Sequence, residues 1–570
     1  MDSRLDRDGR AAALDRMSAG PLDALVIGGG VVGAGTALDL VSRGLRVGLV
    51  EARDWAFGAS GRSSKLIHGG LRHLELFQFG LVKESLRERT LLLDRIAPHL
   101  VRRVPFLYPL HHHAIERAYV GAGLLLYDGL ARVPGQPRAL PHHRHLALRS
   151  VKRIAPGLAT DRVTGAVQYY DAETDDARYV LTLVRTAAAY GALVANRTSC
   201  VELLRDADRV VGARVIDELS GAEHEIRATV VVSAAGVWTD RLLGPLADPD
   251  AADPPRPGVA SKGIHLVVPR DRIRASTGVV TRAGSSVLFL IPWGRFWIIG
   301  TTDTPWREEL EHPAATARDI EELLSAVNRH LAAPLTEADV VGCYAGLRPL
   351  SSFRPRRAGD VVGSPLSSEL RVTAPRRGLV VAAGGSFTTY RVMAARAGDA
   401  AGREIGGLIE RSVTTRLPLL GAEGYHARWN QRHLLARQAG LPVGRIEHLL
   451  NRYGSLADEL LVGIAERPSL GRAVPGAEDY LAAEIVYAAS HEGALHLTDI
   501  LGRRTGIAIE TRDWGVSAAP FAADLVAEVL GWDERETARQ ISVYLDRIEA
   551  ERRSHTMPDD ASAAAALTGW

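Results

Sequence analysis

Residues 22–33 read LDALVIGGGVVG, a short apolar run that ends abruptly in three consecutive glycines. A helical pattern follows over residues 31–43, and a second apolar run over residues 46–50 ends at Glu51. A dinucleotide-binding βαβ unit consists of a strand, a glycine turn, a helix, a second strand and an acid, and all five parts occur here within about 30 residues. The sequence therefore predicts such a unit at the start of the folded chain.

The glycines of this unit have the spacing Gly28-x-Gly30-x-x-Gly33. Gly28 permits the tight turn, Gly30 lets the backbone approach a pyrophosphate, and Gly33 lets the helix pack on the strand. The free N–H groups at the start of the helix then hold the diphosphate. Glu51, at the end of the second strand, accepts both ribose hydroxyls, with Ala52 beside it. An acid at this position disfavours NADP and leaves FAD or NAD.

Two further strands that end in glycine occur far downstream, over residues 230–236 and 379–385. An FAD-binding domain of the two-dinucleotide-binding-fold type is assembled from such separated pieces, whereas an NAD site usually needs only the first unit. The sequence therefore favours FAD as the cofactor.

Composition excludes several classes of protein. Of 570 residues, 46% are hydrophobic and 24% are charged, which is typical of a soluble globular protein. Lys plus Arg number 69 against 67 Asp plus Glu, and a net charge of +2 argues against a nucleic-acid partner. Two cysteines, Cys200 and Cys343, indicate a reducing compartment. The charged N-terminus lacks the apolar core of a signal peptide, and no apolar run reaches membrane-spanning length. We expect a cytoplasmic protein.

The remaining sequence indicates further elements. Residues 104–150, rich in Pro and His, predict loops with one short helix. Residues 262–303 alternate apolar and polar side chains, which predicts an antiparallel sheet, and the pattern after about residue 420 is helical. The adjacent histidines 111–113 cannot all face one ion, so we predict a solvated loop there and no metal site.

These patterns predict an α/β fold. A Rossmann-like FAD domain of the two-dinucleotide-binding-fold type is joined by an antiparallel-sheet substrate domain and an all-α C-terminal domain. The predicted FAD domain comprises residues 20–80, 150–260 and 370–405, the substrate domain 81–149 and 261–369, and the helical domain 406–555. Residues 1–19 and 556–570 are expected to be flexible termini.

After the second strand, residues 63–72 read SSKLIHGGLR, and together with Gly28 to Gly35 this stretch strongly resembles the flavin-dependent glycerol-3-phosphate dehydrogenases. The further matches are DDAR (175–178), AGVW (235–238), KGIH (262–265), IGTTD (299–303), GLRPL (346–350), TTYR (388–391), RYGS (452–455) and EGA (492–494). The resemblance covers roughly residues 20–550.

The resemblance implies FAD-dependent oxidation of sn-glycerol 3-phosphate to dihydroxyacetone phosphate. A hydride passes to flavin N5, the hydroxyl proton passes to a base, and the electrons pass to a quinone or another acceptor. It implies that FAD is held by Gly28, Gly30, Gly33, Glu51, Ala52, Ser63, Ser64, Lys65, Leu66, Ala235, Gly236, Gly385 and Thr388. The catalytic residues that it implies are His265 or His68 as the base, with Arg72 and Arg348. The implied substrate-binding residues are Arg72, His73, Arg348, Ser386, Thr388 and Tyr390.

The chain departs from the family at the implied phosphate clamp. Family members carry Tyr at the position of His73, Lys at Ser386 and, in the loop before the last strand, Arg at Ser368. Loss of two cations that each contribute about 1.5–3 kcal/mol would weaken phosphate binding roughly a hundredfold or more.

Three functions stay open at this point. In the first, the arginine-rich loop with Arg354, Arg356 and Arg357 replaces the missing cations, and glycerol 3-phosphate is the substrate. Alternatively, the chain is a diverged paralogue that oxidises another secondary alcohol or hydroxy compound, or a flavin-binding protein without turnover. The resemblance also leaves open peripheral contact with the inner face of the cell membrane, and a homodimer.

Overall fold

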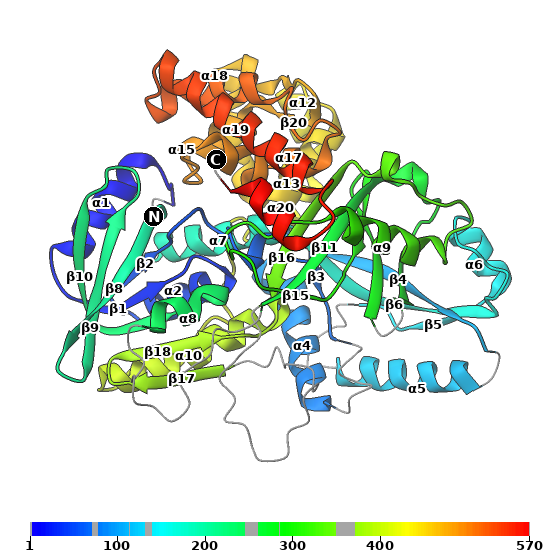
Figure 1. Ribbon diagram of the computed structural model, residues 1–570, viewed down its shortest axis with the longest axis horizontal. Helices are drawn as coiled ribbons and strands as arrows, with labels where there is room; N and C mark the ends of the chain where they lie inside the picture. Colours follow the sequence, from blue (N-terminus) through cyan, green and yellow to red (C-terminus); the bar gives the residue numbers. More distant parts are fainter. Residues whose placement is uncertain are drawn as a thin grey trace.

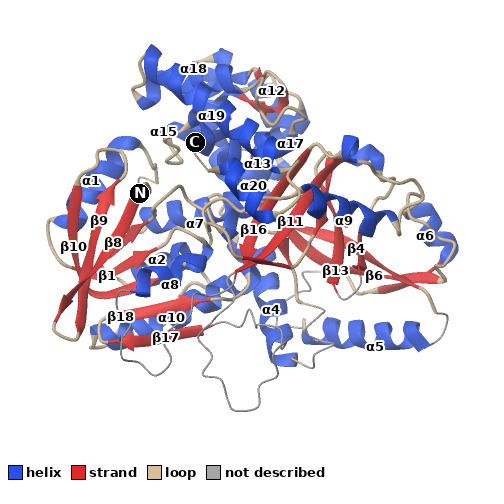
Figure 2. Cartoon of the chain, viewed as in Figure 1, coloured by secondary structure: helices blue, strands red, loops and turns tan. Residues whose placement is uncertain are grey.

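The structure, a computed structural model, describes residues 3–70, 78–112, 115–131, 140–244, 260–283, 286–348 and 371–568. Two large sheets lie side by side, and a helical C-terminal part packs over both of them (Figures 1 and 2). This architecture confirms the predicted fold class, although a two-stranded hairpin interrupts the helical part.

The first sheet contains the βαβ unit predicted from the glycine turn. Its strands lie in the order β17 (Arg371–Arg376), β18 (Leu379–Ala383), β10 (Glu223–Ser233), β1 (Leu22–Ile27), β2 (Val47–Val50) and β7 (Leu193–Ala195). All neighbours are parallel except β17 and β18, and a hairpin of β8 (Thr198–Asp206) and β9 (Arg209–Asp217) extends from β10. Helices α2 (Val31–Val41), α7 (Asp176–Ala189) and α10 (Tyr390–Ile405) pack with this sheet in one hydrophobic core. Because both faces are covered, β1 and β2 are almost continuously apolar.

The second sheet has ten strands and is mostly antiparallel, as the alternation over residues 262–303 predicts. Its order is β15 (Thr304–Trp306), β11 (Ala260–Pro269), β14 (Phe296–Gly300), β13 (Ser286–Trp293), β12 (Gly278–Ala283), β4 (Val101–Leu110), β6 (Gly165–Thr174) and β3 (Leu66–Ile67). Strand β16 (Gly342–Arg348) pairs with β11, and β5 (Arg144–Ala147) pairs with β6.

Two of the predicted boundaries in this region are wrong. Strand β6 pairs with β4 along its whole length, and β3 pairs with β6, so both belong to the second sheet and not to the FAD sheet. Strand β4 itself occupies a segment predicted as loop. Its prolines, Pro105 and Pro109, disfavour a strand in sequence but are tolerated here, because β12 pairs with β4 only at Phe106 and Leu107.

One face of the second sheet carries helices α4 (Phe79–Leu91) and α5 (Ile115–Leu130), and the opposite face carries α6 (Leu148–Ile154) and α9 (Ala317–Asn328). Along the described parts of the chain, none of the helices combines the length and the apolar character that crossing a membrane requires. The C-terminal helices are α11 (Tyr425–Asn430), α12 (Arg432–Ala439), α13 (Val443–Tyr453), α14 (Ala457–Glu466), α15 (Ala482–Ser490), α16 (Leu497–Asp499), α17 (Ile507–Glu510), α18 (Ala519–Leu530) and α19 (Glu534–Ser554), with the hairpin β19 (Ala473–Val474) and β20 (Ala477–Leu481).

Buried ion pairs fasten the helical part to the first sheet. The Arg504 guanidinium donates to both carboxylate oxygens of Asp54, at 2.6 and 2.7 Å, and Arg503 donates to the same carboxylate at 2.5 Å. Arg178, at the start of α7, pairs with Glu492. A buried charge is costly without its partner, so these ion pairs hold the helical part in a fixed position against the first sheet.

Both ends of the described chain are ordered helices, so the prediction of flexible termini is wrong. Helix α1 (Arg7–Ser18) buries Leu14 and Met17 against the first sheet. Helix α20 (Asp560–Leu567) buries Leu567, and its Asp560 pairs with Lys262 on β11. Each buried side chain of this size contributes about 1.5–3 kcal/mol, and no stretch of apolar residues in the sequence reveals this packing.

Candidate active site

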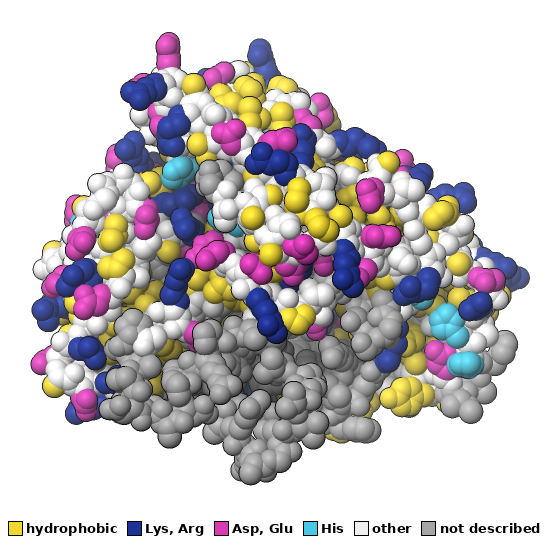
Figure 3. Space-filling view, in the orientation of Figure 1, with side chains coloured by type: hydrophobic (Ala, Val, Ile, Leu, Met, Phe, Trp, Pro, Cys, Tyr) yellow, Lys and Arg dark blue, Asp and Glu magenta, His cyan; other side chains and the backbone are white. Residues whose placement is uncertain are grey.

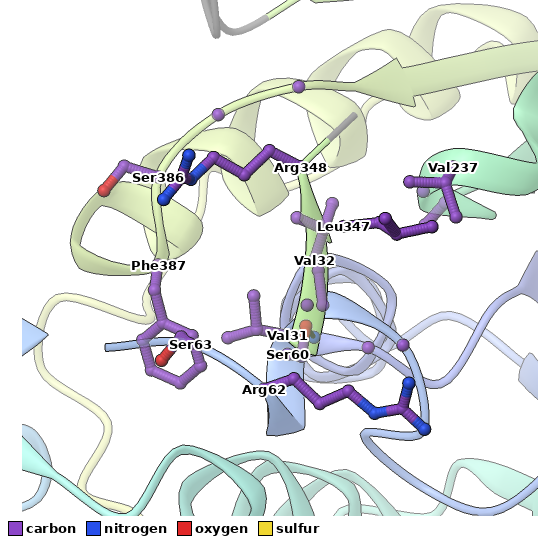
Figure 4. A pocket seen from close by; sticks show the side chains of 18 of the residues that line it. Val31, Val32, Ser60, Arg62, Ser63, Val237, Leu347, Arg348, Ser386 and Phe387 are labelled. Atoms are coloured by element: carbon purple, nitrogen blue, oxygen red, sulfur yellow. Dashed lines mark hydrogen bonds between the residues drawn. The ribbon is translucent and has the colours of Figure 1, made fainter. Parts of the chain in front are cut away.

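A cavity of about 1630 Å³ lies between the two sheets. It runs from the glycine turn after β1 to the strands of the second sheet, and segments that lie far apart in the sequence line it (Figure 4). The lining includes Gly28, Gly30, Glu51, Ala52, Ser60, Arg62, Ser63, Ser64, Leu66, His68, Ala235, Gly236, His265, Arg348, Gly385, Ser386 and Phe387.

The glycine turn has the form that a diphosphate requires. Gly28 has a φ of +113°, and a Cβ there would lie 2.5 Å from the carbonyl oxygen of Ala234. A Cβ on Gly33 would clash with the carbonyl oxygen of Gly28, which explains the close packing of α2 on β1. Gly30 is the N-cap of α2 and has no side chain to cap the helix, and both Gly30 and Val31 line the cavity.

Glu51 lies at the end of β2, as the sequence predicts. Its carboxylate accepts from the backbone N–H groups of Gly29, at 2.6 Å, and Arg53, at 2.8 Å. Burial raises the pKa of Glu51, and these two hydrogen bonds oppose the rise. Each carboxylate oxygen can accept a second hydrogen bond, so the side chain suits a ribose diol.

The stretch 63–66 is fixed by one carboxylate at the start of α7. Asp176 accepts from the backbone N–H of Ser63 at 2.8 Å and from the Lys65 ammonium at 2.5 Å. Lys65 is therefore turned out of the large cavity, which corrects its side chain's predicted place beside a flavin. Burial alone would lower the pKa of Lys65, but the charges of Asp176 and Asp175, with the hydrogen bond to Asp176, together raise it.

His265 lies on β11 and faces the cavity. Its Nε2 is 2.8 Å from the Ser64 hydroxyl, its ring stacks on Tyr344 with centroids 4.8 Å apart, and its Nδ1 is buried without a partner in the described structure. Burial, together with the charges of Arg348 and Lys65, lowers the pKa of His265 to about 3. The imidazole is consequently neutral near pH 7 and can accept a proton.

His68 follows β3 and also lines the cavity. Its backbone N–H donates to the Thr388 hydroxyl at 3.1 Å, and its Nδ1 accepts from the backbone N–H of Gly70 at 3.1 Å. A neutral ring that accepts at Nδ1 carries its proton on Nε2, so His68 has a hydrogen-bond donor at Nε2.

The two candidate substrate residues Arg348 and Ser386 lie at one end of the cavity, and the Arg348 side chain extends toward Ser386 in the view of Figure 4. Arg348 reaches Asp303 Oδ1 at 3.2 Å and donates to the Thr301 hydroxyl at 3.2 Å. The Ser386 hydroxyl accepts from the backbone N–H of Thr388 at 3.3 Å.

Four predicted residues, Gly33, Lys65, Thr388 and Tyr390, lie outside the cavity lining. Thr388 is buried and holds the backbone of His68. Tyr390 is also buried, and its hydroxyl lies 3.0 Å from that of Tyr179, so a predicted contact with substrate is corrected to packing against Gly35 of α2. Arg72, His73, Ser368 and the arginines at 354, 356 and 357 lie outside the described residues.

Sequence reasoning missed three contributors to the site. Ser60 accepts from the backbone N–H of Val31 at 3.0 Å and supports the start of α2. Phe387 lines the cavity, and Asp176 fixes its wall. The small residues at 58–61 are a weak signal for Ser60, but no signal distinguishes Asp176 from the neighbouring Asp175.

Known proteins resemble this chain over nearly its whole length. A family model described as FAD dependent oxidoreductase matches residues 23–400, and one described as the C-terminal domain of alpha-glycerophosphate oxidase matches residues 412–537. The glycerol-3-phosphate dehydrogenase of Mycobacterium leprae is 49% identical over 561 residues, which is 98% of this chain and 94% of that protein. The human mitochondrial glycerol-3-phosphate dehydrogenase is 34% identical over 569 residues, 94% of this chain and 75% of that protein.

A solved structure agrees with these matches. The glycerol-3-phosphate dehydrogenase from Bacillus halodurans, complexed with FAD, superposes with a TM-score of 0.75 at 27% identity and covers 95% of this chain and 98% of that one. The glycine turn, the acid after β2 and the glycine N-cap of α2 fit the same cofactor here. The chain therefore belongs to the family of FAD-dependent glycerol-3-phosphate dehydrogenases and is an FAD-dependent oxidoreductase that acts on a CH–OH group.

Proposed function

We propose that the protein oxidises sn-glycerol 3-phosphate to dihydroxyacetone phosphate. The names of its relatives support this substrate. The observation that carries the proposal is that one cavity joins the glycine turn of the cofactor site to His265 and Arg348. A base and a guanidinium at the end of a dinucleotide site are what the oxidation of a phosphorylated alcohol needs.

The cofactor is held by residues from both sides of the cavity. Gly28, Gly30 and the start of α2 receive the diphosphate, Glu51 receives a ribose, and Ser63 and Ser64 border the flavin. When bound, FAD supplies the acceptor for the hydrogen and the electron pair that leave the alcohol carbon.

His265 takes the hydroxyl proton in this proposal. Its neutral ring and its place in the cavity lining support the assignment, because a neutral imidazole has one nitrogen that can accept a proton. His68, with Nδ1 already occupied by Gly70, donates from Nε2 and orients the substrate oxygen. Arg348, whose side chain is 40% exposed, then attracts the phosphate.

Ser386 supports a second candidate function. It brings a hydroxyl to the end of the cavity beside Arg348, whereas the resemblance leads us to expect a lysine there. A site with fewer cations favours a less anionic secondary alcohol, because each charge-assisted hydrogen bond to phosphate contributes about 1.5–3 kcal/mol. A different hydroxy compound is then the substrate, with the same cofactor and the same base.

The electron acceptor that we propose is a quinone in a lipid bilayer, and helix α5 supports contact with that surface. Tyr119, Leu125 and Leu126 are 65%, 66% and 41% exposed, and with Ala118 and Ala122 they form one apolar face. Hydrophobic atoms are visible over α5 at the lower right of Figure 3. Such a face favours peripheral binding to a membrane. A homodimer stays a prediction.

Anaerobic mixing tests the proposed substrate. Glycerol 3-phosphate added to the FAD-loaded protein should bleach the flavin absorbance, and bleaching should be slowed at least about a hundredfold in His265→Asn if this ring is the base. Bleaching by an unphosphorylated alcohol but not by glycerol 3-phosphate would favour the second candidate. A flavoprotein that no alcohol bleaches would contradict both candidates.

A further inference from the structure

Arg62 lies where the large cavity meets a second, smaller cavity of about 130 Å³. Its backbone belongs to the stretch that follows Ser60, and its carbonyl oxygen lies beside Gly346 of β16. Figure 4 shows its guanidinium on the lower side of the cavity, with Ser60 and Val31 labelled nearby. The side chain is only partly exposed.

The guanidinium of Arg62 has neither a hydrogen bond nor an ion pair with any residue that the structure describes. Its recorded contact is with the Phe57 ring, whose centroid lies 5.3 Å away. Seven arginines line the large cavity, and all but Arg62 and Arg348 are exposed to solvent. Arg348 has a carboxylate partner in Asp303, so Arg62 differs from it in lacking one.

The surroundings of Arg62 carry positive charge. Arg503 lies over the same Phe57 ring at 5.6 Å, and its own guanidinium is committed to Asp54 and Asp499. Glu551 is the nearby acid, and Arg547 binds it at 2.9 and 3.0 Å. Burial, together with the charge of Arg547, lowers the pKa of Arg62 to about 10. The cluster therefore holds a guanidinium that no described acid binds.

A partly buried guanidinium without an acceptor loses hydration and gains little in return. Its planar set of donors matches two oxygens of a phosphate. Ser60, two residues earlier, lies at the start of α2, where the diphosphate of FAD is expected. The small cavity on the other side has room for one phosphate ion.

We propose that Arg62 binds phosphate oxygens, either those of the FAD diphosphate or those of a free phosphate ion in the small cavity. The proposal concerns the cofactor and the anion site and does not depend on which alcohol is oxidised. No alcohol is present in its tests, so their outcome is separate from that of the proposed function.

Titration of the apoprotein tests whether Arg62 binds the diphosphate of FAD. FAD and riboflavin, which has no phosphate, are each added to wild type and to Arg62→Gln, and binding is followed by flavin fluorescence. If Arg62 binds the diphosphate, the Kd for FAD should rise about 10- to 100-fold, and the Kd for riboflavin should stay the same. Arg62→Lys keeps the charge with a shorter reach and should show an intermediate loss for FAD alone.

The control is Arg539→Gln, which removes a guanidinium bound to Glu536 on the exposed side of α19. It removes the same charge from the protein and should leave both Kd values unchanged. Equal weakening of FAD and riboflavin by Arg62→Gln would indicate a structural role and overturn the first source.

Thermal unfolding of the FAD-loaded protein tests the second source. Inorganic phosphate, compared with chloride at equal ionic strength, should raise the unfolding temperature of wild type in a saturable way and leave that of Arg62→Gln unchanged. This result with an unchanged FAD Kd assigns Arg62 to a free phosphate ion. If phosphate has no such effect and the FAD Kd is unaltered in both variants, Arg62 binds no phosphate and the proposal is wrong.

Discussion

At the scale of single residues, burial keeps two histidines of this protein neutral. His265 and His99 are 2% and 1% exposed, and burial lowers the pKa of each to about 3. An unfolded chain binds a proton on histidine near pH 6.5, so the unfolded state binds more protons between pH 6.5 and 3. The contribution of each group to stability is therefore fully present above pH 6.5 and is lost as the pH falls toward 3.

His99 allows this effect to be measured away from the active-site cavity. Wild type should lose stability between pH 7 and pH 5, and His99→Phe should lose about 2 kcal/mol less over the same interval. Urea midpoints at the two pH values measure the difference, and the exposed His112→Gln serves as the control. Equal losses in all three proteins would contradict a neutral buried His99.

Ser386 decides at the same scale between the two candidate substrates. Ser386→Lys should lower the KM for glycerol 3-phosphate about 10- to 100-fold, because a charge-assisted hydrogen bond to phosphate contributes about 1.5–3 kcal/mol. Ser386→Gln supplies length without charge and should leave KM nearly unchanged. Steady-state kinetics with both variants make the test, and an unaltered KM in Ser386→Lys would remove position 386 from the phosphate site.

At the scale of elements, the start of α7 determines the shape of the cavity wall. Asp176→Asn can still accept from the backbone of Ser63, but it leaves Lys65 as a buried charge without its acid. The expected destabilisation is about 3–5 kcal/mol, with weaker FAD binding. Thermal unfolding and FAD titration measure both effects.

The double variant Lys65→Met with Asp176→Leu separates charge from packing at this position. It removes both buried charges and should recover much of the lost stability, because an apolar pair of similar volume often replaces a buried ion pair without cost. FAD binding should recover less, since the acceptor for Ser63 is missing. Stability that stays as low as in Asp176→Asn would mean that the unpaired charge is not the cause.

Helix α5 carries the prediction for the membrane. Leu125→Glu with Leu126→Glu should reduce binding to lipid vesicles about tenfold or more, because each buried leucine contributes about 1.5–3 kcal/mol. Val462→Glu changes a residue of α14 that is 57% exposed and is the matched control. Flotation with vesicles measures binding, and equal flotation of all variants would exclude α5 as the contact.

The elements that the sequence predicts well are those with local patterns. The βαβ unit around Gly28 and the alternating strands between 262 and 303 are both confirmed. The sequence predicts the wrong sheet for strand β6 because its partner β4 lies about sixty residues earlier, and nothing in either segment encodes that pairing. Lys65 and Asp176 lie even farther apart in the sequence, so the sequence does not predict that the Lys65 side chain points toward Asp176.

At the scale of the whole molecule, the end of the chain closes the second sheet. Lys262 lies between Asp319, at 2.5 Å, and Asp560, and α20 covers Trp306 and Leu347. Deleting residues 556–570 should lower the unfolding temperature on the order of 5 °C, through lost apolar burial and one lost ion pair. Asp560→Asn isolates the ion pair and should lower it less; an unchanged temperature in the truncated protein would contradict the packing of α20.

The residues of the candidate site also fall into those that the sequence predicts and those that only the fold reveals. One cavity brings together eight of the residues that the resemblance implies, namely Gly28, Gly30, Glu51, Ser63, Ser64, His68, His265 and Arg348. Their roles stay predictions. Tyr390 and Thr388 lie behind the wall because the turn before α10 rotates them toward the interior, a rotation that a string of residues does not reveal. Single motifs thus locate the region, and only the fold shows which side chains enter it.

The order of strands in the first sheet has a consequence for biosynthesis. β1 is made early, yet its neighbour β10 appears some two hundred residues later, and β18 covers the far edge of β10 only after residue 379. During translation, β1 and then β10 each have an edge whose backbone N–H and C=O groups are still unpaired. The Asp54 carboxylate likewise lacks its partners until Arg503 and Arg504 have been synthesised. Capture of the flavin nucleotide is thus expected to follow chain release, and prematurely terminated products should aggregate as colourless protein.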